Sequence, residues 1–329
     1  MAQRVEGMTE SRLLVGDIGG TNARFALVDP GTAQVSNELA LKCADFDSPA
    51  LAMRHYLDVH PGRDPAAICI AAAGPVVGGC VDFTNSNWRL CEMSLSQAFG
   101  GIGVRVINDF EATAHSLLRL SGSDLAVVGL EPLPRLDEGE FTLGVIGPGT
   151  GLGAAALLRR GDSTVALGTE VGHVGFAPET ALQKAIWEVL RHRFGRVSDE
   201  RLLSGSGIEN IYTALSEIHH NPVQPLTAAE IFNEVHDNHL AAETVNLFFE
   251  TLGQVAGNFA LSMGAFDGIY IGGGIVQRYE TLLMESSFRA SFENKGRHRH
   301  IMEKIPVALI RHPHPGLLGA AALALSLPG

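Results

Sequence analysis

The chain of 329 residues contains only four cysteines, and no two of them form a C-x-x-C pair. Such pairs are typical of structural zinc ligands, so their absence argues against a structural metal site. Most of the cysteines lie inside apolar segments, where a thiol behaves as a small hydrophobic side chain. We therefore expect reduced core residues, rather than disulfides or metal ligands, at Cys43, Cys69, Cys80 and Cys91.

Long hydrophobic runs and an excess of positive charge are also missing. No segment approaches the ~18 apolar residues of a membrane span, and residues 1–12 lack the apolar stretch of a signal peptide. There are 24 Lys and Arg residues against 36 Asp and Glu, for a formal net charge of −12. Such a charge repels nucleic acid and anionic lipid overall. We expect a cytoplasmic protein with no nucleic-acid or membrane partner.

Two segments share a pattern of apolar run, glycine turn and second apolar run. In the first, residues 13–18 lead through Gly19-Gly20-Thr21-Asn22 into residues 23–28; in the second, residues 141–146 lead through 147–153 into 154–158. Glycine lets backbone N–H groups approach a bound anion closely, in part by adopting a positive φ. Each turn alone also suits an ordinary β-hairpin. Their repetition favours two phosphate-binding hairpins.

The second glycine segment also fits a relaxed dinucleotide-binding pattern, G-x-G-x-x-A, with Gly149, Gly151 and Ala154. That fold needs a crossover helix of at least ~10 residues after the loop. Residues 159–162, Arg-Arg-Gly-Asp, interrupt the chain too soon, so we predict a strand instead. A Walker loop is excluded as well, because neither glycine segment ends in Gly-Lys-Ser/Thr.

Apolar periodicity predicts an α/β protein, and the chain length suggests two domains. The predicted domains are 1–119 with 312–329, and 120–311, with residues 121–140 as connecting structure. Predicted strands lie at 12–17, 23–28, 35–41, 67–71, 80–84, 104–108, 268–272 and 306–310, besides the pair in the second glycine segment. Predicted helices lie at 48–59, 110–119 and 240–264, and near the C-terminus.

Asp109 stands between an apolar strand and a helix. A carboxylate in that place can accept the proton of an alcohol and direct its oxygen towards phosphorus. It can equally cap the helix N-terminus. Position alone leaves both interpretations open.

Three polar segments offer the carboxylates and amides that sugar hydroxyls need. The first, 84–88, reads Thr-Asn-Ser-Asn-Trp and also suits a turn. In the second, Glu170 and His173 have the i, i+3 spacing of helical metal ligands, but the glycines around them argue against a helix. The third contains Glu200, which also suits a solvated surface.

Together these motifs resemble the actin-like ATPase superfamily and, more narrowly, the bacterial glucokinase family. The resemblance rests on Asp-Ile-Gly-Gly-Thr-Asn-Ala-Arg, Thr-Asn-x-x-Trp, Ile-Asn-Asp-Phe, Gly-Thr-Gly-Leu-Gly, Glu-x-Gly-His, Glu-Arg-x-Leu-Ser-Gly and Pro-Gly-Leu-Leu-Gly, in order along nearly the whole chain. It implies two ribonuclease-H-like domains with a nucleotide and sugar cleft between them. Pro148 and Val171 depart from the family pattern, and both departures spare the polar groups and bear on loop shape.

The resemblance also implies an activity and a set of site residues. The activity is transfer of the γ-phosphoryl group of ATP, with Mg²⁺, to the C6 hydroxyl of D-glucose in glycolysis, by a homodimer. Asp109 is the implied catalytic base, and Asp17 the implied Mg²⁺ ligand, directly or through water. The implied glucose-binding residues are Asn85, Asn108, Asp109, Glu170, His173 and Glu200. The implied nucleotide-binding residues are Gly16, Asp17, Ile18, Gly19, Gly20, Thr21, Asn22, Gly149, Thr150, Gly151, Gly273 and Gly274.

Three alternatives share parts of this pattern. A kinase of another hexose would carry the same motifs. A chaperone-type ATPase of the superfamily would keep the glycine loops but would need no polar sugar pocket. A non-catalytic sugar sensor would keep Glu170, His173 and Glu200 without needing Asp109, so the presence of Asp109 favours the enzyme.

Overall fold

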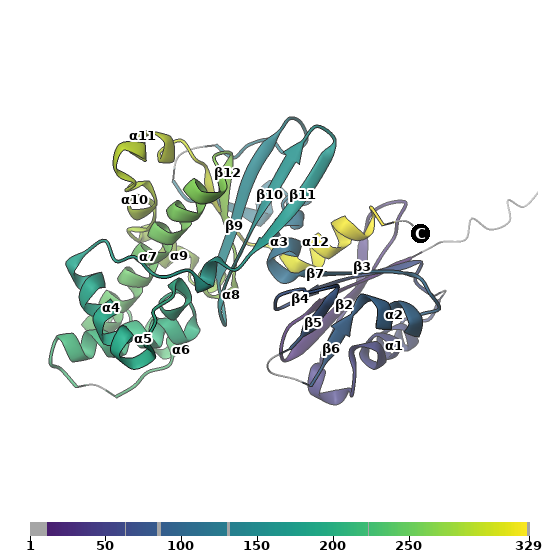
Figure 1. The fold of residues 1–329 in the computed structure, drawn as a ribbon, viewed down its shortest axis with the longest axis horizontal. Coiled ribbons are helices and arrows are strands. Elements are labelled where there is room, and N and C mark those ends of the chain that lie inside the picture. Colours follow the sequence, from purple (N-terminus) through teal and green to yellow (C-terminus); the bar gives the residue numbers. More distant parts are fainter. Residues whose placement is uncertain (1–11, 63, 84–86, 130–131, 223, 328–329) are drawn as a thin grey trace, which may run out of the picture. The chain divides into compact units, whose positions relative to one another are not determined.

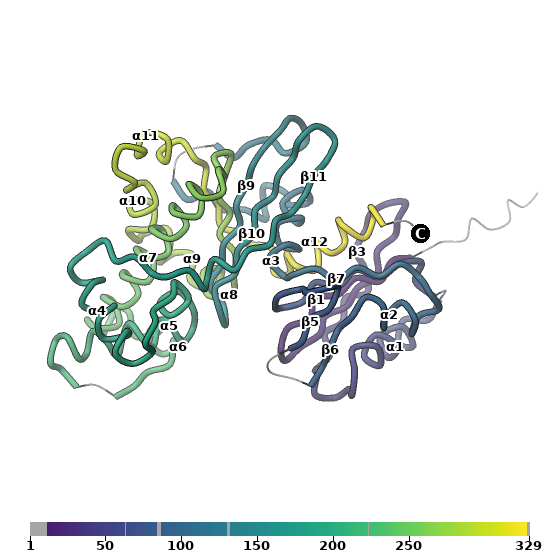
Figure 2. Tube along the Cα trace, viewed as in Figure 1, coloured from purple at the N-terminus to yellow at the C-terminus, as the bar shows by residue number. Residues whose placement is uncertain are grey.

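The computed structural model describes residues 12–62, 64–83, 87–129, 132–222 and 224–327. The chain divides into two compact units, one formed by residues 1–119 and 313–329 and the other by residues 120–312. In each unit, helices pack on a mixed β-sheet (Figures 1 and 2). We call them unit 1 and unit 2.

The sheet of unit 1 has the strand order β3-β2-β1-β4-β7. Its strands are β1 Leu13–Ile18, β2 Asn22–Val28, β3 Val35–Lys42, β4 Ala67–Ala72 and β7 Gly103–Asn108. The first three form an antiparallel meander, whereas β4 and β7 continue the sheet parallel to β1. All five were predicted from the sequence, because their apolar runs end at recognisable turn residues.

Helices cover both faces of this sheet. They are α1 Pro49–Val59, α2 Glu92–Ala98, α3 Asp109–Ser116 and α12 Pro315–Ala324. Alternate side chains of β1 enter different cores: Leu13 and Val15 pack with α3 and α12, and Leu14 packs with α1 and α2. The C-terminal helix α12 lies against α3, which brings the two ends of the sequence into one unit (Figure 1).

A short hairpin of β5 (Cys80–Asp82) and β6 (Arg89–Cys91) corrects one sequence-based expectation. The antiparallel register sets Cys80 opposite Cys91, and the two form a disulfide with a Cα–Cα distance of 4.2 Å. The expectation of reduced cysteines is therefore wrong for this pair, because strand pairing and not local sequence brings them together. It is confirmed for Cys43 and Cys69, which are free and buried.

Five strands of the sheet of unit 2 repeat the topology of the first sheet, and β8 (Leu125–Val127) is added at one edge. The other strands are β9 Phe141–Pro148, β10 Leu152–Arg160, β11 Ser163–Thr169, β12 Gly268–Ile271 and β13 Val307–Ile310. The strands lie in the order β11-β10-β9-β12-β13-β8. An antiparallel meander again meets two parallel strands, β12 and β13. Two copies of one topology agree with the recurrence of glycine turns in the sequence.

Two features of this sheet bear on the predictions. The segment after Gly151 is strand β10 and not a helix, which confirms that the dinucleotide-binding pattern was misleading. Residues 121–140 were predicted as connecting structure, but β8 within them pairs with β13 at the sheet edge. Three residues are too short for an alternating pattern to be recognised, so this strand was missed.

Unit 2 is rich in helices, and their apolar side chains form much of its core. The helices are α4 Ala181–Phe194, α5 Gly205–Ile218, α6 Ala228–Asn233, α7 His239–Met263, α8 Gly274–Arg278, α9 Glu280–Glu285, α10 Phe288–Glu293 and α11 Arg299–Met302. The long helix predicted at 240–264 is confirmed as α7, which Asn238 caps and Gly264 ends in the left-handed conformation. Its apolar stripe packs in the core of the unit.

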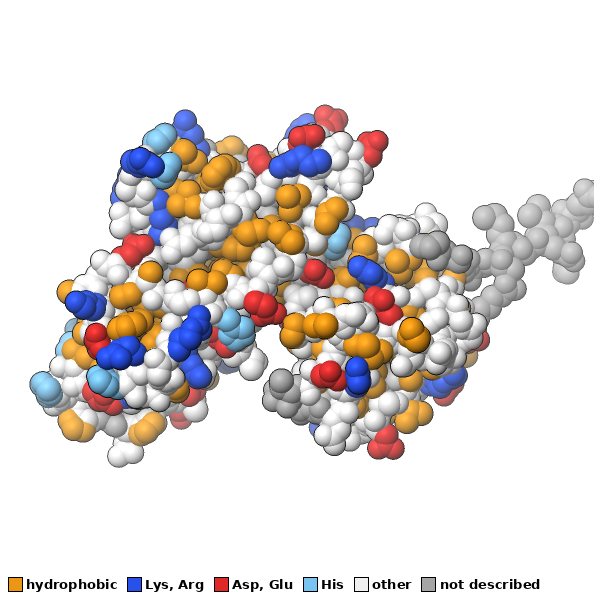
Figure 3. All heavy atoms as spheres, in the orientation of Figure 1, with side chains coloured by type: hydrophobic (Ala, Val, Ile, Leu, Met, Phe, Trp, Pro, Cys, Tyr) orange, Lys and Arg blue, Asp and Glu red, His pale blue; other side chains and the backbone are white. Residues whose placement is uncertain are grey.

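The surface carries charges of both signs. On the visible face of each unit, Lys and Arg side chains are interspersed with Asp and Glu rather than gathered by sign (Figure 3). Among the residues that the structure describes, no helix is both long enough and apolar enough to cross a lipid bilayer.

Candidate active site

Three strands of unit 1 end at the same edge of its sheet. β1 and β7 both run parallel to β4, and the register sets Ile18 beside Ala72 and Ala72 beside Asn108. Neighbouring strands lie about 4.8 Å apart, so the ends of β1 and β7 are about 10 Å apart across β4. The first glycine turn, which follows β1, therefore shares an edge with Asn108 and Asp109.

Asn108, and not Asp109, caps helix α3. Its Oδ1 accepts hydrogen bonds from the N–H groups of Phe110 at 2.8 Å and Glu111 at 3.4 Å, and Glu111 completes a capping box. Its Nδ2 donates to the carbonyl oxygen of Gly74 at 3.0 Å. Asp109 is the first helical residue and is half-buried, and its Oδ1 accepts from the N–H of Phe110 at 3.0 Å. The capping interpretation of Asp109 is wrong, because its neighbour holds that position.

Asp17 lies near the end of β1 and is half-buried. Burial raises the pKa of its carboxyl group, and the positive charge of Arg24, its register partner on β2, opposes that rise. Helix α12 packs against it at Gly316, where an added Cβ would lie 3.0 Å from Asp17 Oδ2. A half-buried carboxylate of this kind is stabilised in its charged form by a nearby cation.

Side-chain packing at Gly16 and a hydrogen bond across the turn hold the backbone at the first glycine segment. An added Cβ at Gly16 would lie 2.9 Å from the side chains of Ile70 and Phe25, so β1 has no room for one there. Gly19 donates its N–H to the carbonyl oxygen of Asn22 at 2.9 Å. Gly19 does not use the positive φ that glycine allows, and this hydrogen bond closes the turn.

A cavity of about 470 Å³ lies beside this turn within unit 1. It is lined by Gly20, Thr21, Cys43, Ala44, Phe46, Asp47, Asn87 and Trp88. The indole Nε1 of Trp88 donates to the carbonyl oxygen of Phe46 at 2.9 Å, which anchors one wall. The sugar-binding expectation for Asn85 falls outside the described residues.

In unit 2, the second glycine segment joins β9 to β10. Pro148 pairs with Leu152, and the N–H of Gly149 donates to the carbonyl oxygen of Gly151 at 2.8 Å. Gly273 lies directly against this loop with a φ of +92°, and an added Cβ there would lie 2.3 Å from the carbonyl oxygen of Pro148. Only glycine fits this position. The backbone that leads into α8 is therefore packed against the glycine loop, as a shared nucleotide site requires.

Leu152 links the glycine loop to both sugar-binding segments expected in unit 2. Its N–H donates to Glu200 Oε2 at 3.0 Å. An added Cβ at Gly172 would lie 2.2 Å from the carbonyl oxygen of Leu152, so the turn around Gly172 packs closely on β10. Gly151 is equally constrained, since an added Cβ would lie 2.4 Å from the same Glu200 Oε2. The glycine loop, Glu200 and this turn thus meet at one point.

That turn, η3 (Val171–His173), carries Glu170 and His173 at its two ends. Their side chains are 61% and 63% exposed, and Glu170 Oε2 lies 3.9 Å from His173 Nε2. The carbonyl oxygen of His173 accepts a hydrogen bond of 2.7 Å from Arg196. A carboxylate and an imidazole held side by side at the surface offer the acceptor and donor that sugar hydroxyls need.

Two residues beside Glu200 were missed by sequence reasoning. Asp199 is buried, and burial raises the pKa of its carboxyl group to about 7 although the charge of Arg196 opposes this. Gly205 donates its N–H to the carbonyl oxygen of Gly149 at 2.9 Å, which adds a second tie to the glycine loop. The run Ser-Asp-Glu at 198–200 is typical of a solvated turn, so only tertiary packing distinguishes Asp199.

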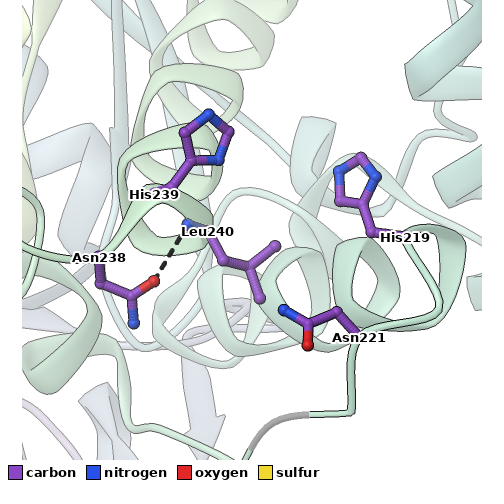
Figure 4. A pocket seen from close by; sticks show the side chains of 5 residues that line it. All are labelled: His219, Asn221, Asn238, His239 and Leu240. Atoms are coloured by element: carbon purple, nitrogen blue, oxygen red, sulfur yellow. Dashed lines mark hydrogen bonds between the residues drawn. The ribbon is translucent and has the colours of Figure 1, made fainter.

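The expected site residues thus form two groups, and the structure brings each group together within its own unit. In unit 1 these are residues 16–22 with Asn108 and Asp109. In unit 2 they are Gly149, Thr150, Gly151, Glu170, His173, Glu200, Gly273 and Gly274. A separate cavity of about 280 Å³ in unit 2 contains none of them; it is lined by His219, Asn221, Asn238, His239 and Leu240 (Figure 4).

Comparison with known proteins agrees with this arrangement. A model of the glucokinase family matches residues 14–327. The chain belongs to the glucokinase family. It is 44% identical over 311 residues to a glucokinase of Caulobacter sp. (strain K31), which covers 94% of this chain and 93% of that relative. It is 41% identical over 323 residues to a glucokinase of Xylella fastidiosa (strain M23), which covers 96% and 95%.

A solved structure supports the same conclusion. The crystal structure of a glucokinase from an Antarctic psychrotroph has a TM-score of 0.88 and 35% sequence identity, covering 97% of this chain and 100% of that one. The predicted fold class, an α/β protein with two domains of the actin-like ATPase type, is confirmed. The predicted class of activity, an ATP-dependent hexose kinase of the glucokinase family, is confirmed as well.

Proposed function

We propose that this member of the glucokinase family transfers the γ-phosphoryl group of ATP to the C6 hydroxyl of D-glucose, giving glucose 6-phosphate and ADP in glycolysis. The packing at Leu152 carries the proposal. A glycine loop suited to phosphate meets Glu200 there, together with the turn that carries Glu170 and His173. Phosphoryl transfer needs groups that donate hydrogen bonds to the phosphates next to groups that bind the sugar hydroxyls.

Asp109 is the proposed catalytic base. Its carboxylate would accept the proton of the C6 hydroxyl and direct the oxygen in line with the γ-phosphorus. Two features of unit 1 support this role. Asp109 follows the carboxyl end of a parallel strand, in the first turn of α3, and Asn108 rather than Asp109 caps that helix. Ligands of α/β proteins bind at this end of the strands.

Glucose is proposed to bind through Asn108, Asp109, Glu170, His173 and Glu200, with Asn85 as a further contact. Each sugar hydroxyl both donates and accepts hydrogen bonds, so carboxylates, an amide and an imidazole suit it. Glu200 supports this role, because Leu152 holds one of its carboxylate oxygens at a set position. A side chain held in this way loses little conformational entropy when it binds a ligand.

ATP is proposed to bind through backbone N–H groups of both glycine segments. Thr21 and Asn22 would add neutral donors to the phosphates. Gly273 and Gly274 would receive the adenosine, which agrees with the close backbone approach at Gly273. The complete proposed set is Gly16, Asp17, Ile18, Gly19, Gly20, Thr21, Asn22, Gly149, Thr150, Gly151, Gly273 and Gly274.

Asp17 is the proposed ligand of Mg²⁺, directly or through a water. Mg²⁺ keeps several waters and binds through one or two carboxylates and substrate phosphates. Within the described ranges, no cluster of three or more His, Cys, Asp or Glu side chains is arranged to hold a metal ion. One half-buried carboxylate at the end of β1 fits an ion that obtains its other ligands from water and ATP. When bound, Mg²⁺ neutralises charge on the phosphates.

We further propose that the protein works in the cytoplasm as a homodimer. Family membership supports a metabolic kinase, and two-fold symmetric dimers are the commonest soluble oligomers. The net charge of −12 favours solubility. Sedimentation of the purified protein measures the oligomeric state directly.

The experiment that tests the activity crosses sugars with phosphoryl donors. Glucose, mannose and fructose are each incubated with ATP, ADP or polyphosphate in the presence of Mg²⁺, and phosphorylated sugar is quantified. We expect the highest kcat/KM for glucose with ATP, and loss of activity when EDTA removes the metal. A higher kcat/KM for another hexose would reassign the substrate, and no transfer in any combination would contradict the proposed kinase.

Replacing Gly151 by Ala tests the link between the loop and Glu200. The new Cβ would lie 2.4 Å from Glu200 Oε2, so this carboxylate must shift, and we expect it to lose its charge-assisted hydrogen bond to Leu152. Loss of such a bond costs about 1.5–3 kcal/mol, so kcat/KM for glucose should fall by about 10–100-fold. Steady-state kinetics checks this, with Gly122→Ala as the control, because a Cβ added at Gly122 meets nothing within 4 Å. Equal kinetics of the two variants would contradict the coupling.

A further inference from the structure

The β5–β6 hairpin carries a cysteine pair that phosphoryl transfer does not require. Cys80 and Cys91 face each other in the antiparallel register and form a disulfide. Both residues are partly exposed to solvent, so small thiols and disulfides have access to them. The pair is therefore placed for reversible thiol–disulfide exchange.

The other two cysteines are unsuited to such chemistry. Cys43 and Cys69 are buried and free. Burial raises the pKa of the Cys69 thiol to about 12, and it also raises the pKa of the Cys43 thiol. The thiolate is the reactive form of cysteine, so both are expected to be inert at neutral pH. They serve as internal controls for the partly exposed pair, Cys80 and Cys91.

One side of the hairpin is tied to the strand that leads to the proposed base. Glu92 follows Cys91 and donates its N–H to the carbonyl oxygen of Gly79 at 3.0 Å. Its Oε1 accepts a hydrogen bond of 2.9 Å from the N–H of Val106 on β7. The residue after Cys91 is thereby connected to β7, which ends at Asn108.

The other side of the hairpin is tied to Asn108 itself. The Nδ2 of Asn108 donates to the carbonyl oxygen of Gly74, which lies shortly before Cys80 in the chain. Gly74 and Glu92 thus lie on either side of the segment that the disulfide closes, and they bond Asn108 and Val106 of β7. β5 and β6 pair over only three residues, and a hairpin of that size is marginally stable without further support.

We propose that Cys80 and Cys91 are a reversible redox site for low-molecular-weight disulfides and thiols, and that the disulfide form binds glucose more tightly because it holds Asn108 in place. The glucose part rests on the proposed function. In oxidation, one cysteine thiolate attacks the small disulfide and releases one small thiolate. The second cysteine thiolate then attacks the mixed disulfide and releases the other. The two protons lost by the cysteines protonate the released thiolates, and reduction is the reverse.

Mass spectrometry after alkylation tests the redox site independently of kinase activity. The protein is equilibrated in buffers of reduced and oxidised glutathione, then alkylated and digested. We expect a peptide pair joined through Cys80 and Cys91 in oxidising buffer and both thiols alkylated in reducing buffer. Persistence of free Cys80 and Cys91 in oxidising buffer would overturn the proposal, whatever the activity of the protein.

Kinetics of the two forms tests the effect on glucose. We expect the KM for glucose to be about fivefold or more higher in the reduced form, within the usual range of coupling between two sites. Cys80→Ser should have the KM of the reduced form in both buffers, whereas Cys69→Ala should keep the response to glutathione. Equal KM values in the two forms would overturn the regulatory part. Absence of glucose phosphorylation in both forms would count against the proposed function instead.

Thermodynamic linkage gives a further test: glucose should change the thiol–disulfide equilibrium of Cys80 and Cys91, whereas it would not if the disulfide were only structural. If the disulfide form binds glucose more tightly, saturating glucose without ATP must favour disulfide formation by the same factor. The value of [GSH]²/[GSSG] at which half of the protein is oxidised should therefore rise about fivefold when glucose is added. An unchanged ratio would contradict the coupling, and L-glucose controls for the added solute.

Discussion

Replacement of Asp109 by Asn is expected to lower kcat by roughly 10²–10⁴-fold, the range assigned to general-base catalysis. An amide cannot accept the proton of the C6 hydroxyl, although its oxygen can still accept the 3.0 Å hydrogen bond from the N–H of Phe110. The start of α3 should keep its shape, because Asn108 and Glu111 form the capping box. Steady-state kinetics measures the loss, and calorimetry should still detect glucose binding.

The matched control for this variant is Asp124→Asn. Asp124 also lies in the first turn of a helix and accepts a backbone N–H, here that of Ser121 at 2.8 Å. The same isosteric change at Asp124 should leave kcat near that of the parent protein. Near-normal turnover in Asp109→Asn would remove Asp109 as the base, and loss of glucose binding with intact turnover would assign it a binding role only.

Replacement of Gly319 by Ala is expected to produce the largest loss of stability. Gly319 lies in α12, and an added Cβ would stand 1.6 Å from the carbonyl oxygen of Ala112 in α3. That atom belongs to the backbone, so the two helices must separate to admit a methyl group. Overpacking of this kind costs about 3 kcal/mol or more. The melting temperature should fall by roughly 6–12 °C, measured by thermal unfolding with circular dichroism.

The expected fall in melting temperature tests the packing of α3 against α12, because helix propensity alone predicts a rise. Alanine has a better helix propensity than glycine by about 1 kcal/mol, so without the clash the change in α12 would stabilise the protein. Activity should fall as well, since α3 begins at Asp109. Gly122→Ala again serves as the control, because its added Cβ meets no neighbour. An unchanged or higher melting temperature for Gly319→Ala would contradict the close crossing of α3 and α12.

Elements with local signals were predicted well. The turn residues after β1, and the interruption of the chain after β10, identified two hairpins without tertiary information. The apolar stripe of α7 did the same for a long helix. Short elements such as β8 were missed, because three residues do not display a period.

The candidate site was predictable in its residue types but not in its connections. Asp109 was recognised as a candidate base from a strand that ends in polar residues, yet its alternative role as a cap was excluded only when Asn108 was seen to hold that position. Glu200 was proposed from family resemblance, while its hydrogen bond to Leu152 joins residues 48 positions apart. Asp199 carries no sequence signal at all, because burial, and not its neighbours in the chain, raises its pKa.

By itself the sequence determined the two glycine hairpins, most of the strands in unit 1, and the family to which the chain belongs. These depend on turn chemistry, apolar period and motif order, all of which are local along the chain. Tertiary structure alone decided the disulfide of Cys80 and Cys91, the meeting of Glu200 with Leu152, and the requirement for glycine at Gly319. Each of these depends on the distance between segments remote in sequence, which strand register and helix packing set only when the chain has folded.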